Sequence, residues 1–259
     1  LAAMPDLRGI PKEEPTPKKF EDYWQHYVPL GLLPRLHAYE LMMAPYAIAH
    51  MKIGLKLNET GYRFGSEERA RIYLTNALEP KLKQLSQIGF DALAHEAAAV
   101  NEIKWHKRFT VIIGNPPYSG EGMNKGDWIR SLIDTYMYLD GAHLGEKGKK
   151  NWLQDDYVKF IRYAQFELDK TKLGILGFVT NHSFLDNPTF RGMRASLRQS
   201  FPRIHVLDMH GNSKKLQRGP DDNTDENVFD IQQGVSIGLF SRTPKTANSE
   251  SVAHAHLWG

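Results

Sequence analysis

The sequence predicts an α/β fold with a mainly parallel sheet, and three observations support this prediction. Short apolar runs typical of strands alternate with longer segments whose apolar residues recur every three or four positions, as on one helix face. The run at 109–113 consists of one aromatic and four β-branched residues, which are the residue types that favour strands. Polar side chains follow three of the predicted strands, at the carboxyl ends where folds of this class bind ligands.

Six strands and five helices are expected from these patterns. The strands are expected at residues 35–39, 71–75, 109–113, 173–179, 204–207 and 235–240, and the helices at 43–55, 82–99, 128–139, 157–168 and 190–201. The strand at 109–113 has no polar alternation, so we expect it to be central and covered on both faces. The two histidines His254 and His256 share one face of a possible further strand.

Composition divides the chain into three parts. Residues 1–34 are rich in proline and charged side chains, which predicts a connector with one short helix. Residues 35–242 carry the alternating strand and helix patterns and form the predicted α/β domain, and residues 243–259 the start of a following segment. The first residues carry no clear initiation context, which we interpret as a cut from a longer chain.

Composition also restricts the class of protein. A hydrophobic content of 41% is ordinary for a globular chain of 259 residues. A net charge of +3 is compatible with a polyanionic partner but does not identify one. The absence of cysteine excludes disulfides, thiolate metal sites and a cysteine nucleophile, and it favours a cytoplasmic protein. No apolar stretch approaches the roughly 20 residues of a membrane-spanning helix.

The run Asn115-Pro116-Pro117-Tyr118 stands directly behind the strand at 109–113. The Asn115 side-chain oxygen and the Pro116 carbonyl are two acceptors that suit an exocyclic amine, because accepting its N–H groups localises the nitrogen lone pair. Tyr118 is suited to stack on the base that carries the amine, an interaction worth roughly 1–3 kcal/mol. A base in a duplex must first be flipped out to reach such a site.

This run resembles the catalytic motif of the amino-methyltransferases, and the wider sequence resembles the DNA adenine-N6 methyltransferases of Type ISP and Type IIG restriction-modification enzymes. The resemblance implies a Rossmann-like fold that uses S-adenosylmethionine. It implies that Asn115 and Pro116, with Pro117 and Tyr118, form the catalytic motif, and that Asn115 also borders the cofactor. Tyr118 would stack on the flipped adenine.

Three further phrases extend the resemblance over residues 36–242. Glu40, in a phrase running from Tyr39 to Tyr46, would bind the cofactor ribose, and Asn76 would contact the cofactor adenine. The segment 174–181 resembles a later strand of the family. Phe229, in the segment 228–236, would stack on the other face of the flipped base. The implied partners are double-stranded DNA and further domains of the same polypeptide. These are a domain for target recognition and, as a further candidate, a fused nuclease or translocase. No membrane partner is expected.

One expected feature is missing from the sequence. The glycine-rich loop that wraps the methionine part of the cofactor normally lies on a strand before the Glu40 strand, and no Asp-Pro-x-x-Gly-x-Gly phrase occurs here. We therefore expect a fragment that lacks the first strand and this loop. The alternatives are a protein-glutamine methyltransferase, which uses the same four residues on a side-chain amide, and a catalytically inert DNA-binding fragment.

Simpler interpretations stay open for single residues. Glu40 is alternatively a solvated carboxylate at a strand end, Asn76 a turn-capping side chain and Phe229 a core aromatic. Asp155 and Asp156 fit a helix N-terminus better than a catalytic carboxylate pair. No metal site is expected, because His50, His95 and His106 are scattered and His254 and His256 stand without carboxylate or cysteine partners in a metal-binding pattern.

Overall fold

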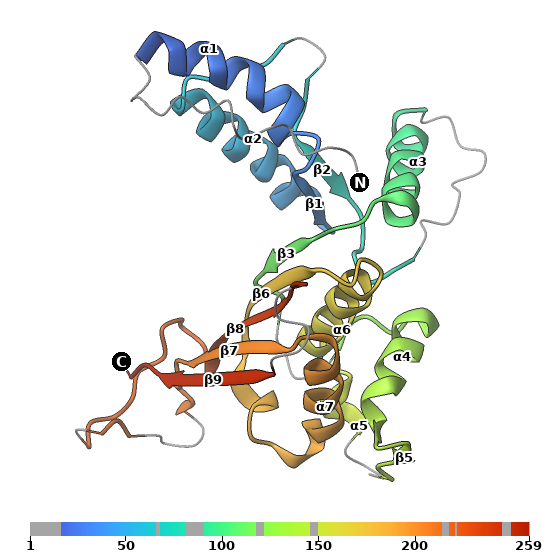
Figure 1. Ribbon diagram of the computed structural model, residues 1–259, viewed down its shortest axis with the longest axis vertical. Helices are drawn as coiled ribbons and strands as arrows, with labels where there is room; N and C mark the ends of the chain where they lie inside the picture. Colours follow the sequence, from blue (N-terminus) through green and yellow to red (C-terminus); the bar gives the residue numbers. More distant parts are fainter. Residues whose placement is uncertain are drawn as a thin grey trace. The chain divides into compact units, whose positions relative to one another are not determined.

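The computed structural model describes residues 17–65, 68–80, 91–117, 122–145, 150–213, 218–220, 222–244 and 250–258 (Figure 1). The chain divides into two compact units, Leu1–Trp105 and His106–Gly259, and each is treated by itself below. Among the described residues, no helix is both long enough and apolar enough to cross a membrane.

The first unit is a small α/β arrangement built on two parallel strands. Its elements are α1 (Pro17–Tyr27), the short π-helix η2 (Val28–Leu32), β1 (His37–Glu40), α2 (Met43–Glu59), β2 (Arg71–Leu74) and α3 (Asp91–His106). Strand β1 pairs with β2, and Glu40 lies opposite Leu74. A cluster of Val28, Leu33, Leu57 and Tyr62 packs the end of η2 against α2. The expected short helix before residue 34 is therefore present as α1.

The second unit contains a five-stranded sheet in the order β3-β6-β8-β7-β9. Its strands are β3 (Val111–Gly114), β6 (Gly174–Asn181), β7 (Arg203–Asp208), β8 (Val235–Arg242) and β9 (Ser251–His256). The pairs β3–β6 and β7–β9 are parallel, whereas β8 runs antiparallel to β6 and β7. With β1–β2, parallel pairing predominates among these strands, as predicted.

Helices and a small hairpin complete the second unit. They are α4 (Asp127–Ile133), η3 (Asp134–Met137), the hairpin β4 (Tyr138–Leu139) and β5 (Ala142–His143), α5 (Lys150–Leu153), α6 (Asp156–Asp169), η4 (His182–Phe184), η5 (Pro188–Phe190) and α7 (Arg191–Ser200). Helices α6 and α7 lie against one face of the sheet (Figure 1). Ile161 and Leu168 of α6 and Leu197 of α7 pack there with Leu176 and Phe240 of the strands.

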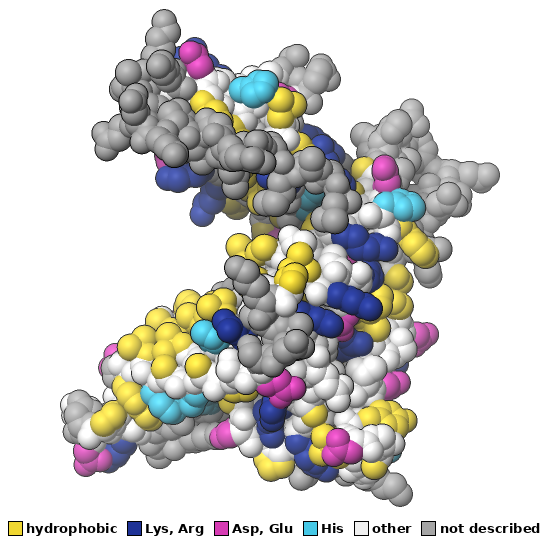
Figure 2. Space-filling model, viewed as in Figure 1, with side chains coloured by type: hydrophobic (Ala, Val, Ile, Leu, Met, Phe, Trp, Pro, Cys, Tyr) yellow, Lys and Arg dark blue, Asp and Glu magenta, His cyan; other side chains and the backbone are white. Residues whose placement is uncertain are grey.

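The other face of this sheet is exposed. The side chains of Ile175 and Leu239 are 42% and 49% exposed, and Figure 2 shows hydrophobic side chains gathered over the strands. Strand β3 is the outermost strand on one side of the sheet in the described strand order, and its residues Val111 and Ile113 are 59% and 79% exposed. The prediction of a central strand is therefore wrong for the described chain, because β3 pairs with β6 along one edge only. The prediction that both faces are covered is wrong as well, because the alternating side chains of Val111 and Ile113 leave one face exposed.

Two other expectations need correction. The helix expected at 128–139 ends at Ile133, and the chain then forms η3 and a hairpin whose turn residues Asp140 and Gly141 adopt positive φ. Residues 243–259 were expected to begin a following segment, but Ser251–His256 form β9 and pair in parallel with β7. Backbone hydrogen bonds to β7 thus include this segment in the same sheet.

Candidate functional site

Several polar residues meet at one edge of the five-stranded sheet. Asn115 follows β3 and His182 follows β6, while Asp208 is the last residue of β7. Strand β8 is antiparallel, so its first residue lies at the same edge, where Val235 pairs with Asn181. This edge holds the carboxyl ends of the parallel strands, which is where α/β folds bind ligands.

The Asn115-Pro116-Pro117 part of the motif lies at this edge as predicted. Asn115 and Pro117 are exposed, whereas Pro116 is buried. The preceding Gly114 contacts β6 closely, since a Cβ at this position would meet the Phe178 ring at 3.0 Å. The motif thus leaves the strand with its polar side chain open to a ligand. Tyr118 lies outside the described residues.

In the first unit, Glu40 and Asn76 lie at the carboxyl end of the parallel pair β1–β2. Glu40 ends β1, and the backbone N–H of Thr75, next to Asn76, donates to the Glu40 carbonyl oxygen at 2.7 Å. The Glu40 Oε1 atom accepts the Met42 N–H at 2.8 Å, which orients the carboxylate at the start of α2. The two residues predicted to bind the cofactor are therefore neighbours at one sheet edge.

The Asn76 side chain caps a turn, as in the simpler interpretation. Its Oδ1 accepts the Leu78 N–H at 3.0 Å, and its Nδ2 donates to Glu79 at 3.3 Å. The ammonium group of Lys104 donates to the Asn76 carbonyl at 2.6 Å and to the Thr75 hydroxyl at 3.0 Å. This turn is held firmly, so any contact of Asn76 with a ligand is made from a fixed position.

Phe229 is not a core residue. Its side chain is 40% exposed, and its backbone N–H donates to Asn227 Oδ1 at 2.8 Å. The Asn227 amide also donates to the carbonyl oxygens of Gly211 and Gln233, at 2.8 and 2.7 Å. Asn227 therefore ties the backbone next to Phe229 to both ends of the segment 211–234, and the aromatic ring is left accessible.

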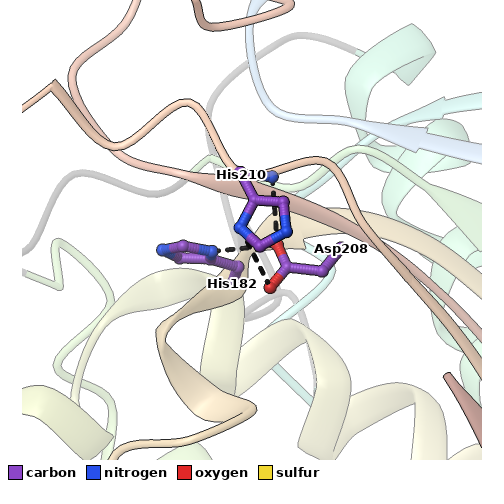
Figure 3. A group of neighbouring side chains, drawn as sticks. All are labelled: His182, Asp208 and His210. Carbon is purple, nitrogen blue, oxygen red and sulfur yellow. Dashed lines mark hydrogen bonds and ion pairs between the residues drawn. The ribbon is translucent and has the colours of Figure 1, made fainter. Parts of the chain in front are cut away.

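A cluster of His182, Asp208 and His210 lies at the same edge and was not identified from the sequence. Both rings turn toward the Asp208 carboxylate (Figure 3), with His182 Nδ1 at 3.0 Å from Oδ1 and His210 Nδ1 at 3.7 Å from Oδ2. All three residues are buried. Burial alone would raise the pKa of Asp208, but hydrogen bonds from His182 and the His210 backbone, together with the charges of both rings, lower it below its usual value.

The sequence contained a signal for this cluster. His182 comes directly after the segment 174–181, which resembles a later strand of the family, and Asp208 follows the run at 204–207. Both positions match the rule that identified Asn115. His256 belongs to the same surroundings, since its Nδ1 lies 2.8 Å from His210 Nε2. The fold thus brings His182 and His256, which are distant from Asp208 in the sequence, close to that carboxylate.

Asp155 and Asp156 are structural residues at the start of α6. Asp155 is the N-cap residue, although its side chain makes no capping hydrogen bond. Asp156 accepts the backbone N–H groups of Met123 and Asn124, at 3.0 and 3.3 Å, and its Oδ1 lies 3.4 Å from Lys159 Nζ. Burial lowers the pKa of Lys159, while the charge of Asp156 and its hydrogen bond oppose this shift. The carboxylate thus compensates a buried charge.

A sequence comparison identifies the family. The model of the Eco57I restriction-modification methylase family matches residues 37–214, which is more than half of the chain. The chain belongs to the Eco57I restriction-modification methylase family. The match spans Glu40, Asn76, the Asn115–Tyr118 motif and the His182–Asp208–His210 cluster, whereas Phe229 lies beyond it. No curated protein matches the chain.

Solved structures of similar fold include two Type ISP restriction-modification enzymes. The enzyme LlaBIII bound to DNA has a TM-score of 0.67 and 23% identity over 92% of this methylase, and a nuclease-deletion mutant of LlaGI with a DNA substrate mimic has a TM-score of 0.65 and 21% identity over 93%. The DrdV–DNA complex has a TM-score of 0.65 and 27% identity over 86%.

The methylase sequence spans only 17%, 20% and 21% of the LlaBIII, LlaGI and DrdV chains. It therefore corresponds to about a fifth of each of these longer chains. The structural likeness confirms the α/β methyltransferase fold that the sequence predicts. Membership of a methylase family agrees with S-adenosylmethionine as the cofactor expected from the sequence.

Proposed function

We propose that this methylase transfers a methyl group from S-adenosylmethionine to the N6 amine of an adenine flipped out of double-stranded DNA. The observation that carries the proposal is the position of Asn115 and Pro116 directly behind β3, at the carboxyl edge of the sheet, in a chain of a restriction-modification methylase family. The DNA-bound state of similar enzymes supports DNA as the partner, and their greater length supports further domains in the same polypeptide.

The Asn115 side-chain oxygen and the Pro116 carbonyl would accept the two N–H groups of the amine and localise its lone pair. S-adenosylmethionine supplies an electrophilic methyl group on a sulfonium. In the proposed transfer the amine nitrogen would form the new N–C bond as the C–S bond breaks, S-adenosylhomocysteine would leave, and the amine would release one proton to water. Tyr118 and Phe229 would stack on the two faces of the flipped adenine.

The residues of the first unit fit the proposed cofactor. The Glu40 carboxylate is oriented by Met42 and is an acceptor suited to the two ribose hydroxyl groups. Leu41, Met42 and Met43 follow it with 63%, 62% and 60% of their surface exposed, and such an apolar surface suits an adenine ring. Asn76 stands at the same edge of the first unit. Asn115, in the second unit, is proposed separately as a cofactor-binding residue.

The direct test of the proposed function uses the intact protein, labelled S-adenosylmethionine and unmethylated genomic DNA. We expect label in N6-methyladenine after the DNA is digested to nucleosides. Label in a protein glutamine would favour the alternative of a glutamine methyltransferase. A third outcome is that calorimetry detects cofactor binding but no methyl group is transferred to DNA or protein. This outcome would contradict the proposal and favour an inert DNA-binding role.

Removing the Glu40 carboxylate is expected to weaken cofactor binding. A hydrogen bond to a charged group is worth about 1.5–3 kcal/mol, so Glu40→Ala should raise the Kd of S-adenosylmethionine about 10- to 150-fold in calorimetry. Glu40→Gln retains an acceptor for Met42 and separates loss of charge from loss of local structure. Glu59→Ala, which removes an exposed carboxylate paired with Lys56 at 3.0 Å, is the matched control and should leave the Kd unchanged. Equal Kd values for Glu40→Ala and the control would contradict the assignment.

A further inference from the structure

Within the second unit, hydrogen bonds and the short backbone stretches between them connect the side chains of His182 and Asp208 to Phe229. The Asp208 Oδ1 atom accepts from His182 Nδ1 and from the His210 backbone N–H, both at 3.0 Å. Asp208 is 9% exposed. A buried carboxylate with two donors on one oxygen is held in a defined position, and it holds those donors in turn.

His182 fixes the end of the segment 211–234. Its backbone N–H donates to the Gly234 carbonyl at 2.9 Å. Its ring packs directly over Gly234, because a Cβ at that glycine would meet the ring atoms Cε1 and Nε2 at 2.4 Å. No larger residue fits under the ring, so glycine at 234 and histidine at 182 form a matched contact.

His210 fixes the start of the same segment. Its carbonyl oxygen accepts the Val235 N–H at 2.9 Å. The next residue, Gly211, has φ +73° and donates its N–H to the buried carboxylate of Asp225. Its carbonyl oxygen accepts from Asn227, the residue that also binds the Phe229 N–H. Both ends of the segment are thus linked to Asp208, and Asn227 links them to Phe229.

We propose that Asp208 and His182 are positioning residues that hold Gly211 and residues 227–234 so that Phe229 meets the flipped base. This proposal rests on the proposed function, in which Phe229 stacks on the target adenine. Asp208 lies at the same sheet edge as Asn115, so the acceptors for the amine and the support of the stacking ring belong to one rigid sheet.

The ligand atoms of His182, Asp208 and His210 lie within 4.8 Å of one another, a spacing that would also suit a metal ion. The pairing of His182 Nδ1 with Asp208 Oδ1 at hydrogen-bond distance favours the polar network. Metal analysis of the purified intact protein separates the two. If the protein contains a stoichiometric divalent ion and the Asp208→Asn variant lacks it, Asp208 is a metal ligand and the proposal is overturned.

A double-mutant cycle in the intact protein tests the positioning role, with unmethylated genomic DNA and labelled cofactor as substrates. Stacking is worth roughly 1–3 kcal/mol per base, so Phe229→Ala and Asp208→Ala, which removes the acceptor of both hydrogen bonds, should each lower kcat/KM for DNA about 5- to 150-fold. If Asp208 acts through Phe229, kcat/KM of the double variant should be only slightly lower than kcat/KM of the less active single variant. Multiplicative losses would overturn the proposal. The Kd for cofactor should not change.

Two histidine variants provide a test that does not depend on the stability of Asp208→Ala. His182→Asn retains a donor near the Nδ1 position, whereas His182→Phe retains a ring without a donor. We expect activity to survive better in His182→Asn, and the reverse order would contradict the role of the Asp208 hydrogen bond.

The control is Asp222→Asn in the same segment, where the carboxylate is exposed and pairs with Arg218 at 3.1 Å; its kcat/KM should match wild type. A wild-type protein that does not methylate DNA would instead refute the proposed function, which keeps the two failures distinct.

Discussion

Replacing Asn115 with alanine is expected to abolish most methyl transfer while leaving the fold intact. Loss of one preorganised hydrogen-bonding group at a reacting centre typically costs about 100- to 1000-fold in rate, and we expect a loss of this size in single-turnover methylation of DNA. The reason is that the amine would lose the acceptor that localises its lone pair. Asn115 is exposed at the end of β3, so the free energy of unfolding should change by less than about 0.5 kcal/mol.

Asn58→Ala is the matched control for this experiment. Asn58 is an exposed asparagine in α2 of the first unit, and its replacement should leave the methylation rate unchanged. Asn115→Asp keeps an oxygen acceptor and should retain more activity than Asn115→Ala. Activity of Asn115→Ala close to that of Asn58→Ala would show that the motif does not hold the reacting amine.

The largest expected effect on stability follows from removing Asp156. The side chains of Asp156 and Lys159 are only 4% and 1% exposed, and their charged atoms lie 3.4 Å apart. Removing one partner of a buried ion pair leaves the other charge uncompensated, which costs about 3–5 kcal/mol. Asp156→Ala also removes the acceptor of the Met123 and Asn124 N–H groups. We expect a corresponding fall in the free energy of unfolding, measured by denaturant titration.

A second substitution shows whether the buried charge is the cause. Adding Lys159→Met to Asp156→Ala removes the unpaired ammonium group and should restore part of the lost stability. Asp127→Ala is the matched control, because Asp127 also stands in the first turn of a helix but is fully exposed, 4.0 Å from Arg130. It should cost less than about 1 kcal/mol. A loss for Asp156→Ala as small as that of the control would contradict the compensating role.

Local sequence patterns predicted the strands and the residues that follow them. The apolar run before Gly114 formed β3, and the four-residue spacing of Ile161 and Leu168 with their neighbours formed the buried face of α6. These features depend on residues a few positions apart, which is why periodicity identifies them. The same patterns placed Glu40 and Asn115 at strand ends, since the end of an apolar run is visible in the sequence.

Helix and strand lengths were less well predicted where a turn competes with a helix. The segment after Ile133 has helical apolar spacing, yet Asp140 and Gly141 adopt positive φ and reverse the chain into a hairpin. The expectation that Val111 and Ile113 are covered failed for a different reason. An apolar run indicates a preference for burial, but what covers a strand depends on which segments pair beside it.

The sequence by itself determined the strand–helix order, the Asn115–Tyr118 motif and its position behind a strand, because each is a local property of the chain. Only the tertiary structure decided that β8 inserts antiparallel between β6 and β7 and that β9 joins the sheet. It also brought Asp208 to His182 and linked both to the segment that carries Phe229. These contacts join residues that are far apart in the chain. Strand pairing and burial create them, and the local periodicity of the sequence does not encode which strands pair.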